Sequence, residues 1–151
     1  MPDPDIRPIT VQQARIVRLP VLRAGFPPET AVFDHDDDPT TLHLGAFDGE
    51  RLVGVATFFP EPYPNDPTVP AWRLRGMATL PDMQRRGVGR ALMREGMAAA
   101  TRAGADVMWF NARVTALGFY RSLGFVAVGD EVVHAMSGAH YVMFQRLRDP
   151  A

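Results

Sequence analysis

The sequence predicts a single α/β domain over residues 1–151, in which helices cover both faces of a mixed β-sheet. Three observations predict it. The length of 151 residues suits one domain with a substantial core. The first half carries the pattern of a β-hairpin, which favours antiparallel pairing. The second half alternates strand-like and helix-like segments, so we expect parallel pairing there.

The composition is that of an ordinary globular protein and excludes several functional classes. Hydrophobic residues make up 46% of the chain and charged residues 22%, and no apolar run approaches the roughly 20 residues that span a bilayer. Met1–Thr10 lacks the pattern of a secretory signal. The absence of cysteine excludes disulfides, thiolate metal sites and a cysteine nucleophile, and it is typical of a reducing cytoplasm. With a net charge of -1, we expect a cytoplasmic protein with neither a nucleic acid nor a membrane partner.

The first half is predicted to contain a strand, a helix and a hairpin. Thr10 is a suitable cap for a helix over Val11–Leu22, where apolar and basic residues recur at helical spacing. Asp48-Gly49 favours a tight turn between two strand-like segments. The second segment is apolar almost throughout, which predicts burial on both faces. The expected strands are Ile6–Ile9, Leu42–Phe47 and Leu52–Phe59.

The second half begins with a loop and continues with alternating strands and helices. Pro60–Pro70 holds five prolines and cannot form a regular element. Gly96 lies inside the main helix, where its missing side chain lets the helix lie close to the sheet. We expect helices at Val88–Ala103 and Val114–Leu123, and strands at Trp72–Thr79, Asp106–Phe110, Phe125–Val128 and Tyr141–Leu147.

The segment Leu74–Leu92 carries the clearest chemical signal. A strand ends near Thr79, and Gln84-Arg-Arg-Gly-Val-Gly leads directly into a helix. The first N–H groups of a helix lack internal partners and carry partial positive charge, and glycines allow an anion to approach closely. The pattern is neither a Walker loop nor a complete dinucleotide fingerprint. Spacing alone therefore leaves phosphate binding and tight helix–sheet packing as equal alternatives.

Two motifs resemble the GNAT superfamily of N-acetyltransferases. Gln84-x-x-Gly87-x-Gly89, with the preceding Leu74-Arg-Gly-Met-Ala-Thr-Leu-Pro strand, is similar to the acetyl-CoA signature of that family. Ala116-Leu-Gly-Phe-Tyr120-Arg-Ser-Leu-Gly124-Phe125 is similar to its A-x-x-x-Y-x-x-x-G-F segment. The resemblance covers about Leu52–Val128 and implies a central, mostly antiparallel mixed sheet with a splayed strand pair.

The resemblance also implies roles for individual residues. Tyr120 is placed where the family protonates the departing thiolate, and it also contacts the coenzyme. Seven residues before the tyrosine the family often has an Asn that contacts the coenzyme; here Arg113 takes that position, the nearest Asn is Asn111, and both are candidates for the contact. The main chain of Met77, Ala78 and Thr79 is expected to pair with the pantetheine arm. The pyrophosphate is expected on Gln84, Arg85, Arg86, Gly87, Val88, Gly89 and Arg90.

The reaction expected from this resemblance is transfer of an acetyl group from acetyl-CoA to a primary amine, by direct attack and with no metal. A protonated amine cannot attack a thioester, so a base or a chain of water molecules must accept a proton first, and Glu61 is one candidate for the base. We expect a small-molecule acceptor, with a protein acceptor left open, and the resemblance allows a homodimer. Two alternatives remain: a non-catalytic acyl-CoA-binding sensor, which would not need Tyr120, and a nucleotide-binding protein.

Some polar clusters are better explained by structure than by chemistry. The run Asp34-His35-Asp36-Asp37-Asp38 lacks the spacing of a calcium loop and predicts a solvated acidic loop, with attraction of a cationic amine as a second reading. His43, His134 and His140 are isolated and are expected to be structural. Glu131 is expected in a late loop.

Overall fold

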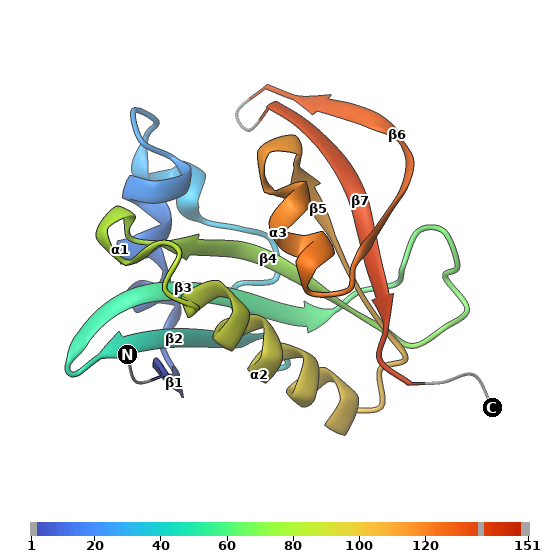
Figure 1. Ribbon diagram of the computed structural model, residues 1–151, viewed down its shortest axis with the longest axis horizontal. Coiled ribbons are helices and arrows are strands. Elements are labelled where there is room, and N and C mark those ends of the chain that lie inside the picture. Colours follow the sequence, from blue (N-terminus) through green and yellow to red (C-terminus); the bar gives the residue numbers. More distant parts are fainter. Residues whose placement is uncertain (1–2, 136–137, 149–151) are drawn as a thin grey trace. The chain divides into compact units, whose positions relative to one another are not determined.

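The computed structural model describes residues 3–135 and 138–148, and its elements follow the predicted order (Figure 1). In the first half they are β1 (Asp5–Pro8), α1 (Val11–Leu22), the 3-10 turn η1 (Pro28–Ala31), β2 (Leu42–Asp48) and β3 (Arg51–Pro60). In the second half they are β4 (Ala71–Thr79), η2 (Pro81–Met83), α2 (Val88–Arg102), β5 (Val107–Arg113), η3 (Val114–Ala116), α3 (Leu117–Ser122), β6 (Val126–His134) and β7 (Gly138–Arg146).

The strands form one mixed sheet in the order β1-β2-β3-β4-β5-β7-β6. The pairs β1·β2, β2·β3, β5·β7 and β6·β7 are antiparallel, and β4 pairs in parallel with β5 at Ala71–Arg73. The mixed α/β fold is therefore confirmed, but parallel pairing throughout the second half was wrong. Strands β5 and β6, which the crossover through α3 connects, do run in the same direction, because each is antiparallel to β7. The last strand, β7, lies between them and pairs antiparallel with each.

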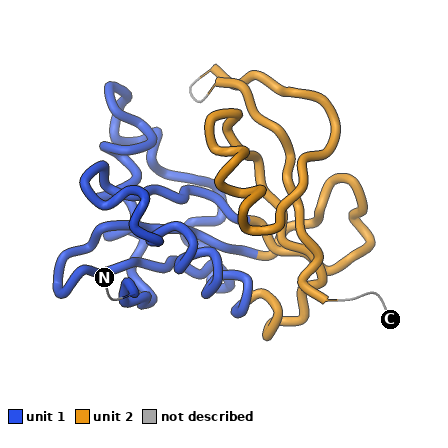
Figure 2. The backbone as a smooth tube through the Cα atoms, viewed as in Figure 1, with its two compact units in different colours: residues 1–59, 74–99 blue, residues 60–73, 100–151 orange. Residues whose placement is uncertain are grey.

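The chain divides into two compact units, each built from two separate stretches of sequence (Figure 2). Unit 1 contains residues 1–59 and 74–99, and unit 2 contains residues 60–73 and 100–151. The boundary cuts β4 after Arg73, so the parallel pairing with β5 belongs to unit 2 and the segment Leu74–Thr79 belongs to unit 1. The prediction of one domain over residues 1–151 stays a prediction.

In unit 1, helices cover both faces of β3. Val55 packs in one cluster with Val17 of α1 and with Ala78 of β4. The neighbouring Gly54 lies against Val88 at the start of α2, because successive strand residues point to opposite faces. The continuous burial predicted for the second hairpin strand is confirmed from Val53 to Phe59.

Helix α1 begins and ends at the predicted residues, and Thr10 caps it as expected. The amide of Gln13 donates to Thr10 Oγ1 at 3.1 Å, and the amide of Thr10 donates to Gln13 Oε1 at 2.8 Å. This reciprocal pair is a capping box, which satisfies two backbone donors at the helix start.

At Gly96, helix α2 lies close against β3 of the sheet. A Cβ at Gly96 would lie 2.1–2.4 Å from atoms of the fully buried Phe58 ring on β3. We expect Gly96→Ala to lower the free energy of unfolding by about 1–3 kcal/mol, because overpacking outweighs the gain in helix propensity. Urea unfolding measures it. The control is Gly118→Ala in α3, where nothing lies within 4 Å of the added carbon, and equal stability of the two variants would contradict the packing argument.

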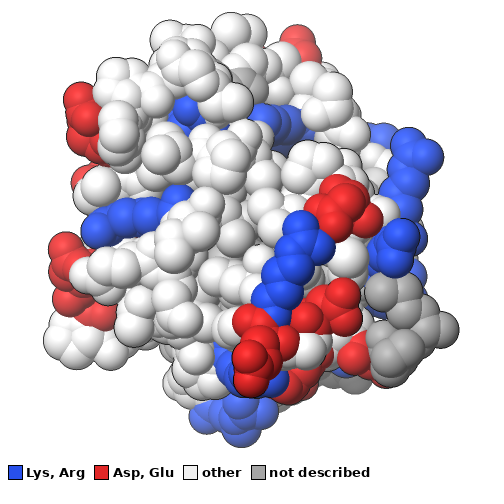
Figure 3. Space-filling model, turned by 90° about the vertical axis from the view of Figure 1, so that its left-hand side faces the viewer, with Lys and Arg blue, Asp and Glu red and all other residues white. Residues whose placement is uncertain are grey.

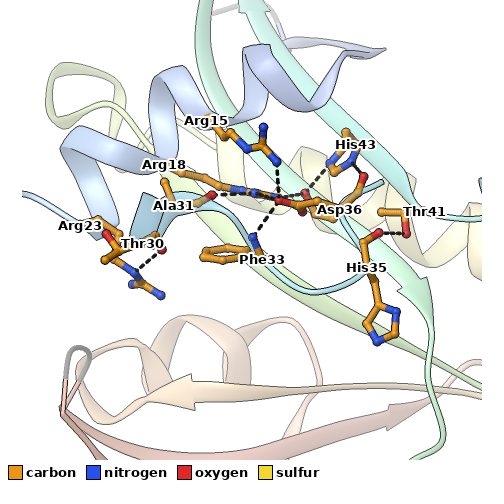
Figure 4. Close-up of polar contacts among 11 residues, drawn as sticks. Arg15, Arg18, Arg23, Thr30, Ala31, Phe33, His35, Asp36, Thr41 and His43 are labelled. Carbon is orange, nitrogen blue, oxygen red and sulfur yellow. Dashed lines mark hydrogen bonds and ion pairs between the residues drawn. The ribbon is translucent and has the colours of Figure 1, made fainter. Parts of the chain in front are cut away.

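A buried ion pair joins α1 to the loop that precedes β2, and it corrects the interpretation of Asp34–Asp38 as a solvated loop (Figure 4). Arg18 is fully buried and donates to both carboxylate oxygens of Asp36, at 2.8 and 3.0 Å. Arg18 also donates to Thr57 Oγ1 at 2.7 Å and to the Ala31 carbonyl at 3.1 Å. The flanking acidic residues are exposed, so only Asp36 departs from the expectation.

His43 and Phe33 complete this buried network. His43 is buried, with Nε2 at 2.9 Å from the Asp36 carbonyl and Nδ1 at 2.8 Å from Thr57 Oγ1, so its structural role is confirmed. Burial alone would raise the pKa of Asp36. Hydrogen bonds from Arg18 and from the Phe33 amide, with the charges of Arg18 and His43, outweigh burial and lower that pKa below the ordinary value.

Unit 2 has its own aromatic core and a longer late strand than predicted. Tyr63 packs against Trp109 and stacks on Phe144, with ring centroids 5.3 Å apart in the second pair. Strand β6 continues to His134 with a register shift after Val128, so Glu131 lies in a strand rather than a loop. This extension was not predicted because Gly129-Asp130-Glu131 is typical of a turn.

The charged side chains are interspersed on the face drawn in Figure 3, where arginines alternate with acidic residues. Among the described residues, no helix is both long enough and apolar enough to cross a membrane. On the face in Figure 3, electrostatic attraction of a ligand therefore depends on local groups rather than on a broad area of one sign.

Candidate active site

The loop between β4 and α2 in unit 1 presents exposed main chain at the start of a helix. Arg85 and Gly87 both have positive φ, at 64° and 82°, whereas Arg86 between them does not. Alternating backbone handedness of this kind turns successive N–H groups toward one side and is typical of anion-binding nests. Gln84 Nε2 donates to the Thr79 carbonyl at 3.2 Å and ties the loop back to the strand.

The same loop leaves room for a ligand. Residues 84–87 are exposed, whereas Val88 is buried and anchors the helix. A Cβ added at Gly87 would meet no atom within 4 Å. The Ala91 amide donates to the Gly87 carbonyl at 3.0 Å, so the amides before Ala91 precede the first helical hydrogen bond. Arg85, Arg86 and Arg90 are exposed and add positive charge.

Strand β4 leads into this loop and holds the three residues expected to bind the pantetheine arm. Ala78 is buried and packs on Val17 and Val55, while Met77 and Thr79 are partly exposed. Gly76, just before them, has a φ of 69°, and a Cβ there would lie 2.9 Å from atoms of both Arg18 and Phe33. A glycine in the left-handed region inside a strand marks a local bulge, so the main chain at Met77 departs from the regular ladder.

Tyr120 lies in α3 of unit 2, in an aromatic environment. It is 9% exposed, and its ring contacts Phe110 at 4.4 Å and Phe119 at 5.0 Å between centroids. Burial raises the pKa of Tyr120 to about 12, although the positive charge of Arg113 opposes the shift. The phenol is therefore protonated at neutral pH and is able to donate that proton to a strong base.

Asn111 and Arg113 lie on β5 of unit 2. They are two residues apart on one strand, so their side chains share a face of the sheet. Asn111 is exposed and pairs in register with Val142, while Arg113 is partly buried and pairs with His140. The positive charge of Arg113 acts on the Tyr120 phenol and opposes the rise of its pKa.

Glu61 follows β3 and is held in place by several contacts within unit 2. Its carboxylate accepts a hydrogen bond from Arg73 Nη1 at 2.9 Å, and its carbonyl accepts one from Trp109 Nε1 at 3.0 Å. Arg73 also stacks on the Trp109 ring at 4.8 Å. The side chain of Glu61 is 27% exposed. Glu61 is therefore ordered, and Arg73 holds one oxygen of its carboxylate.

A family model for the Acetyltransferase (GNAT) family matches residues 13–125, which is more than half of the chain. The chain belongs to this family. It is 30% identical over 144 residues to the "Uncharacterized N-acetyltransferase YitI" of Bacillus subtilis (strain 168), covering 95% of this chain and 97% of that protein. The resemblance seen in the two sequence motifs is thereby confirmed, and the chain is an acyltransferase.

Solved structures show the same fold for this acetyltransferase. An aminoglycoside 6'-N-acetyltransferase complexed with coenzyme A superposes with a TM-score of 0.77 at 13% identity, covering 97% of this chain and 99% of that one. The ribosomal-protein-S18-alanine N-acetyltransferase from Escherichia coli gives 0.74 at 17% identity, with 98% and 96% covered. The two proteins are named for very different acceptors, so the shared fold does not identify the acceptor.

The acetyltransferase places the predicted site residues in two groups. Unit 1 holds the β4 residues and the loop Gln84–Arg90, and unit 2 holds Tyr120, Asn111, Arg113 and Glu61. Among the described residues there is no group of three or more side chains able to hold a metal ion. The contact between His35 and Asp38, three residues later, was not predicted. The whole acidic run was interpreted as solvated, although a His followed by an Asp at this spacing could have indicated a pair.

Proposed function

We propose that this acetyltransferase moves an acetyl group from acetyl-CoA to a primary amine by direct attack within a ternary complex. The observation that carries the proposal is the exposed loop with left-handed Arg85 and Gly87 that opens onto α2. Its main-chain amides and the dipole of α2 suit a pyrophosphate, which coenzyme A carries. In this proposal the residues Gln84–Arg90 bind that group, and the nearby arginines add attraction.

The main chain of Met77–Thr79 binds the pantetheine arm and the thioester in this proposal. Its strand ends where the pyrophosphate loop begins, so one continuous stretch would follow the coenzyme from thioester to phosphate. A main-chain N–H of this stretch would stabilise the oxyanion that forms when the amine attacks. The bulge at Gly76 supports this role because it turns backbone groups out of the regular ladder.

The unit 2 residues supply proton transfer and orientation in this proposal. Tyr120 gives its proton to the departing thiolate, and its buried, protonated phenol supports that role. Asn111 and Arg113 contact the coenzyme. Glu61 stays a candidate for the base, with the handicap that Arg73 already holds its carboxylate.

The acceptor in this proposal is a small molecule with a cationic primary amine. Three exposed carboxylates, Asp34, Asp37 and Asp38, lie in one loop of unit 1 and would attract a positive charge. A protein acceptor would need an extended surface for its chain, and no sequence feature indicates one.

The test is direct transfer. The protein is incubated with acetyl-CoA and separately with spermidine, tyramine, kanamycin and a lysine-containing peptide, and both free thiol and acetylated amine are measured. We expect amine-dependent thiol release matched by acetylated product, with no mass increase of the protein itself. The chain contains no lysine, which simplifies that last measurement. Thiol release without acetylated amine, or an acetylated protein intermediate, would contradict the proposal.

A further inference from the structure

The loop Phe33–Thr41 of unit 1 contains a His–Asp pair, and none of the roles above uses its histidine. His35 Nδ1 lies 2.7 Å from Asp38 Oδ2, and the two side chains are 42% and 54% exposed. His35 also has a φ of 71°. A non-glycine residue in the left-handed region is uncommon and tends to occur where geometry serves a function.

Both residues of the pair are held by an ordered backbone. The His35 carbonyl accepts hydrogen bonds from the Asp38 amide at 3.1 Å and from Thr41 Oγ1 at 2.5 Å, and the Asp38 carbonyl accepts one from the Thr41 amide. The next residue, Asp36, is fixed by the buried ion pair with Arg18. The pair therefore stands on a rigid base although its side chains reach solvent.

The pair lies on the face of the sheet that α1 covers, which is also the face toward which a Cβ at Gly76 would point. Thr57 of β3 bonds to Arg18 of α1, so Phe59, two residues later, points to the same face. The His35 ring lies on Phe59 with centroids 5.0 Å apart. On the neighbouring strand β4, Gly76 lies against Arg18 and Phe33 of the same assembly. Met77, whose main chain is proposed to lie beside the thioester, is the next residue of β4, and its side chain points to the opposite face.

The orientation of the imidazole suits a proton acceptor. With Nδ1 bonded to a carboxylate, the stable neutral tautomer carries its proton on Nδ1 and leaves the lone pair on Nε2. Figure 4 shows the His35 side chain pointing away from the buried Arg18–Asp36 network. Asp34 and Asp37 flank the pair as exposed carboxylates and would draw a cationic amine toward it.

We infer that His35 is the general base that deprotonates the acceptor ammonium, and that Asp38 positions its ring. This inference rests on the proposed acetyl transfer. The ammonium gives one proton to His35 Nε2, and the amine lone pair then forms the C–N bond. Collapse breaks the C–S bond and leaves its electron pair on sulfur, which takes the proton of Tyr120. The second N–H proton leaves to water, and solvent restores the protonation states of His35 and Tyr120.

Kinetics against pH test the base. His35→Asn suits the purpose because Asn tolerates the left-handed backbone. With the acceptor found in the transfer assay, we expect kcat/KM for the amine to fall by about 100-fold or more, and the rising limb of its pH profile to disappear. Calorimetric affinity for acetyl-CoA and stability in urea should stay at wild-type values. The inference is wrong if His35→Asn keeps the wild-type kcat/KM and pH profile. If, in addition, Glu61→Gln lowers kcat/KM and removes the rising limb, Glu61 is the base instead.

A matched pair of variants in the same loop tests the positioning role. Asp38→Asn removes the carboxylate that stabilises the imidazolium, so the rising limb should move to lower pH while the plateau falls. Asp34→Asn removes an exposed carboxylate from the same loop and should leave the midpoint of the limb unchanged. If both variants shift the midpoint equally, Asp38 acts only through its charge and does not position the His35 ring. The other charged groups around this loop are Asp36, Asp37, Arg15, Arg18, Arg23, His43 and Arg75.

Nuclear magnetic resonance separates failure of the inference from failure of the proposed function. The nitrogen shifts of His35 in the free protein report its tautomer without any acceptor. We expect a protonated Nδ1 and an unprotonated Nε2 at high pH, and loss of this preference in Asp38→Asn. If no amine is acetylated but His35 has the expected tautomer, the proposed function is wrong, whereas the positioning of His35 by Asp38 is supported. If amines are acetylated but Nε2 carries the proton, the inference fails alone.

Discussion

Asp36→Asn is expected to lower the free energy of unfolding by about 3–5 kcal/mol, because it leaves the Arg18 guanidinium buried without its counterion. Arg18 is 0% exposed and the Asp36 side chain 2% exposed, so solvent cannot take the place of the lost carboxylate. The free energy is measured by urea unfolding at neutral pH. Replacing both partners, in Arg18→Met with Asp36→Leu, should recover much of the loss because no buried charge is left behind.

The chain offers a matched control for that variant on its own surface. Arg51 and Asp82 form the same two-bond arrangement, at 2.7 and 3.1 Å, but both side chains are more than half exposed. Asp82→Asn should therefore change stability little. A loss in Asp36→Asn no larger than the loss in Asp82→Asn would show that burial does not control the strength of these pairs.

The pH dependence of stability follows from the same pair. The lowered pKa of Asp36 means that the folded protein holds this carboxyl ionised more firmly than the unfolded chain does. The stabilisation is complete at neutral pH and is lost as the pH falls through the lowered pKa. The acid limb of wild-type stability should accordingly be steeper than that of Asp36→Asn.

Tyr120→Phe is expected to reduce kcat by about 10²–10⁴-fold while leaving the affinity for acetyl-CoA within a small factor of wild type. The variant removes only the hydroxyl group, so the packing on Phe110 and Phe125 is retained. The loss arises because the thiolate must then leave without a proton donor. Steady-state kinetics with the acceptor from the transfer assay give kcat, and calorimetry gives the affinity.

Tyr63→Phe is the control for that experiment. Tyr63 is also buried in unit 2, where burial likewise raises the pKa of its phenol, but no role is proposed for it. We expect its kcat to remain close to wild type. If Tyr120→Phe retains wild-type kcat, Tyr120 is a packing residue and the thiolate is protonated by another group or by water.

The parts of the fold that sequence could predict are those set by local signals. Thr10 and the helical periodicity after it define α1, and Asp48-Gly49 defines the hairpin turn, where Gly49 adopts a φ of 62°. The glycines within Gln84–Gly89 likewise predict the loop before α2. Helix starts and tight turns depend on residues that are neighbours in the sequence, so local patterns are sufficient to predict them. Gly96 was predictable because a glycine inside a helix needs a packing explanation, and Phe58 supplies it.

The parts that sequence could not predict depend on contacts between distant residues. Asp36 looks like its exposed neighbours, and its burial is decided by Arg18, which lies 18 positions earlier on a helix. The place of β7 between β5 and β6 likewise depends on the whole sheet rather than on any one segment. The left-handed conformation of Arg85 and of His35 also has no local marker, because neither residue is a glycine.

The proposed function depends on binding of acetyl-CoA to the loop before α2, and calorimetry with the Gly87→Glu variant tests that binding. Gly25→Glu is the matched control, because Gly25 has nearly the same φ, 83° against 82°, and equally open surroundings, so the two substitutions cost similar backbone strain. We predict that wild type and Gly25→Glu bind acetyl-CoA with similar affinity, and that Gly87→Glu, folded by circular dichroism, loses binding because its side chain brings bulk and negative charge to the pyrophosphate. Undiminished binding by the folded Gly87→Glu variant would show that acetyl-CoA binds elsewhere than at this loop.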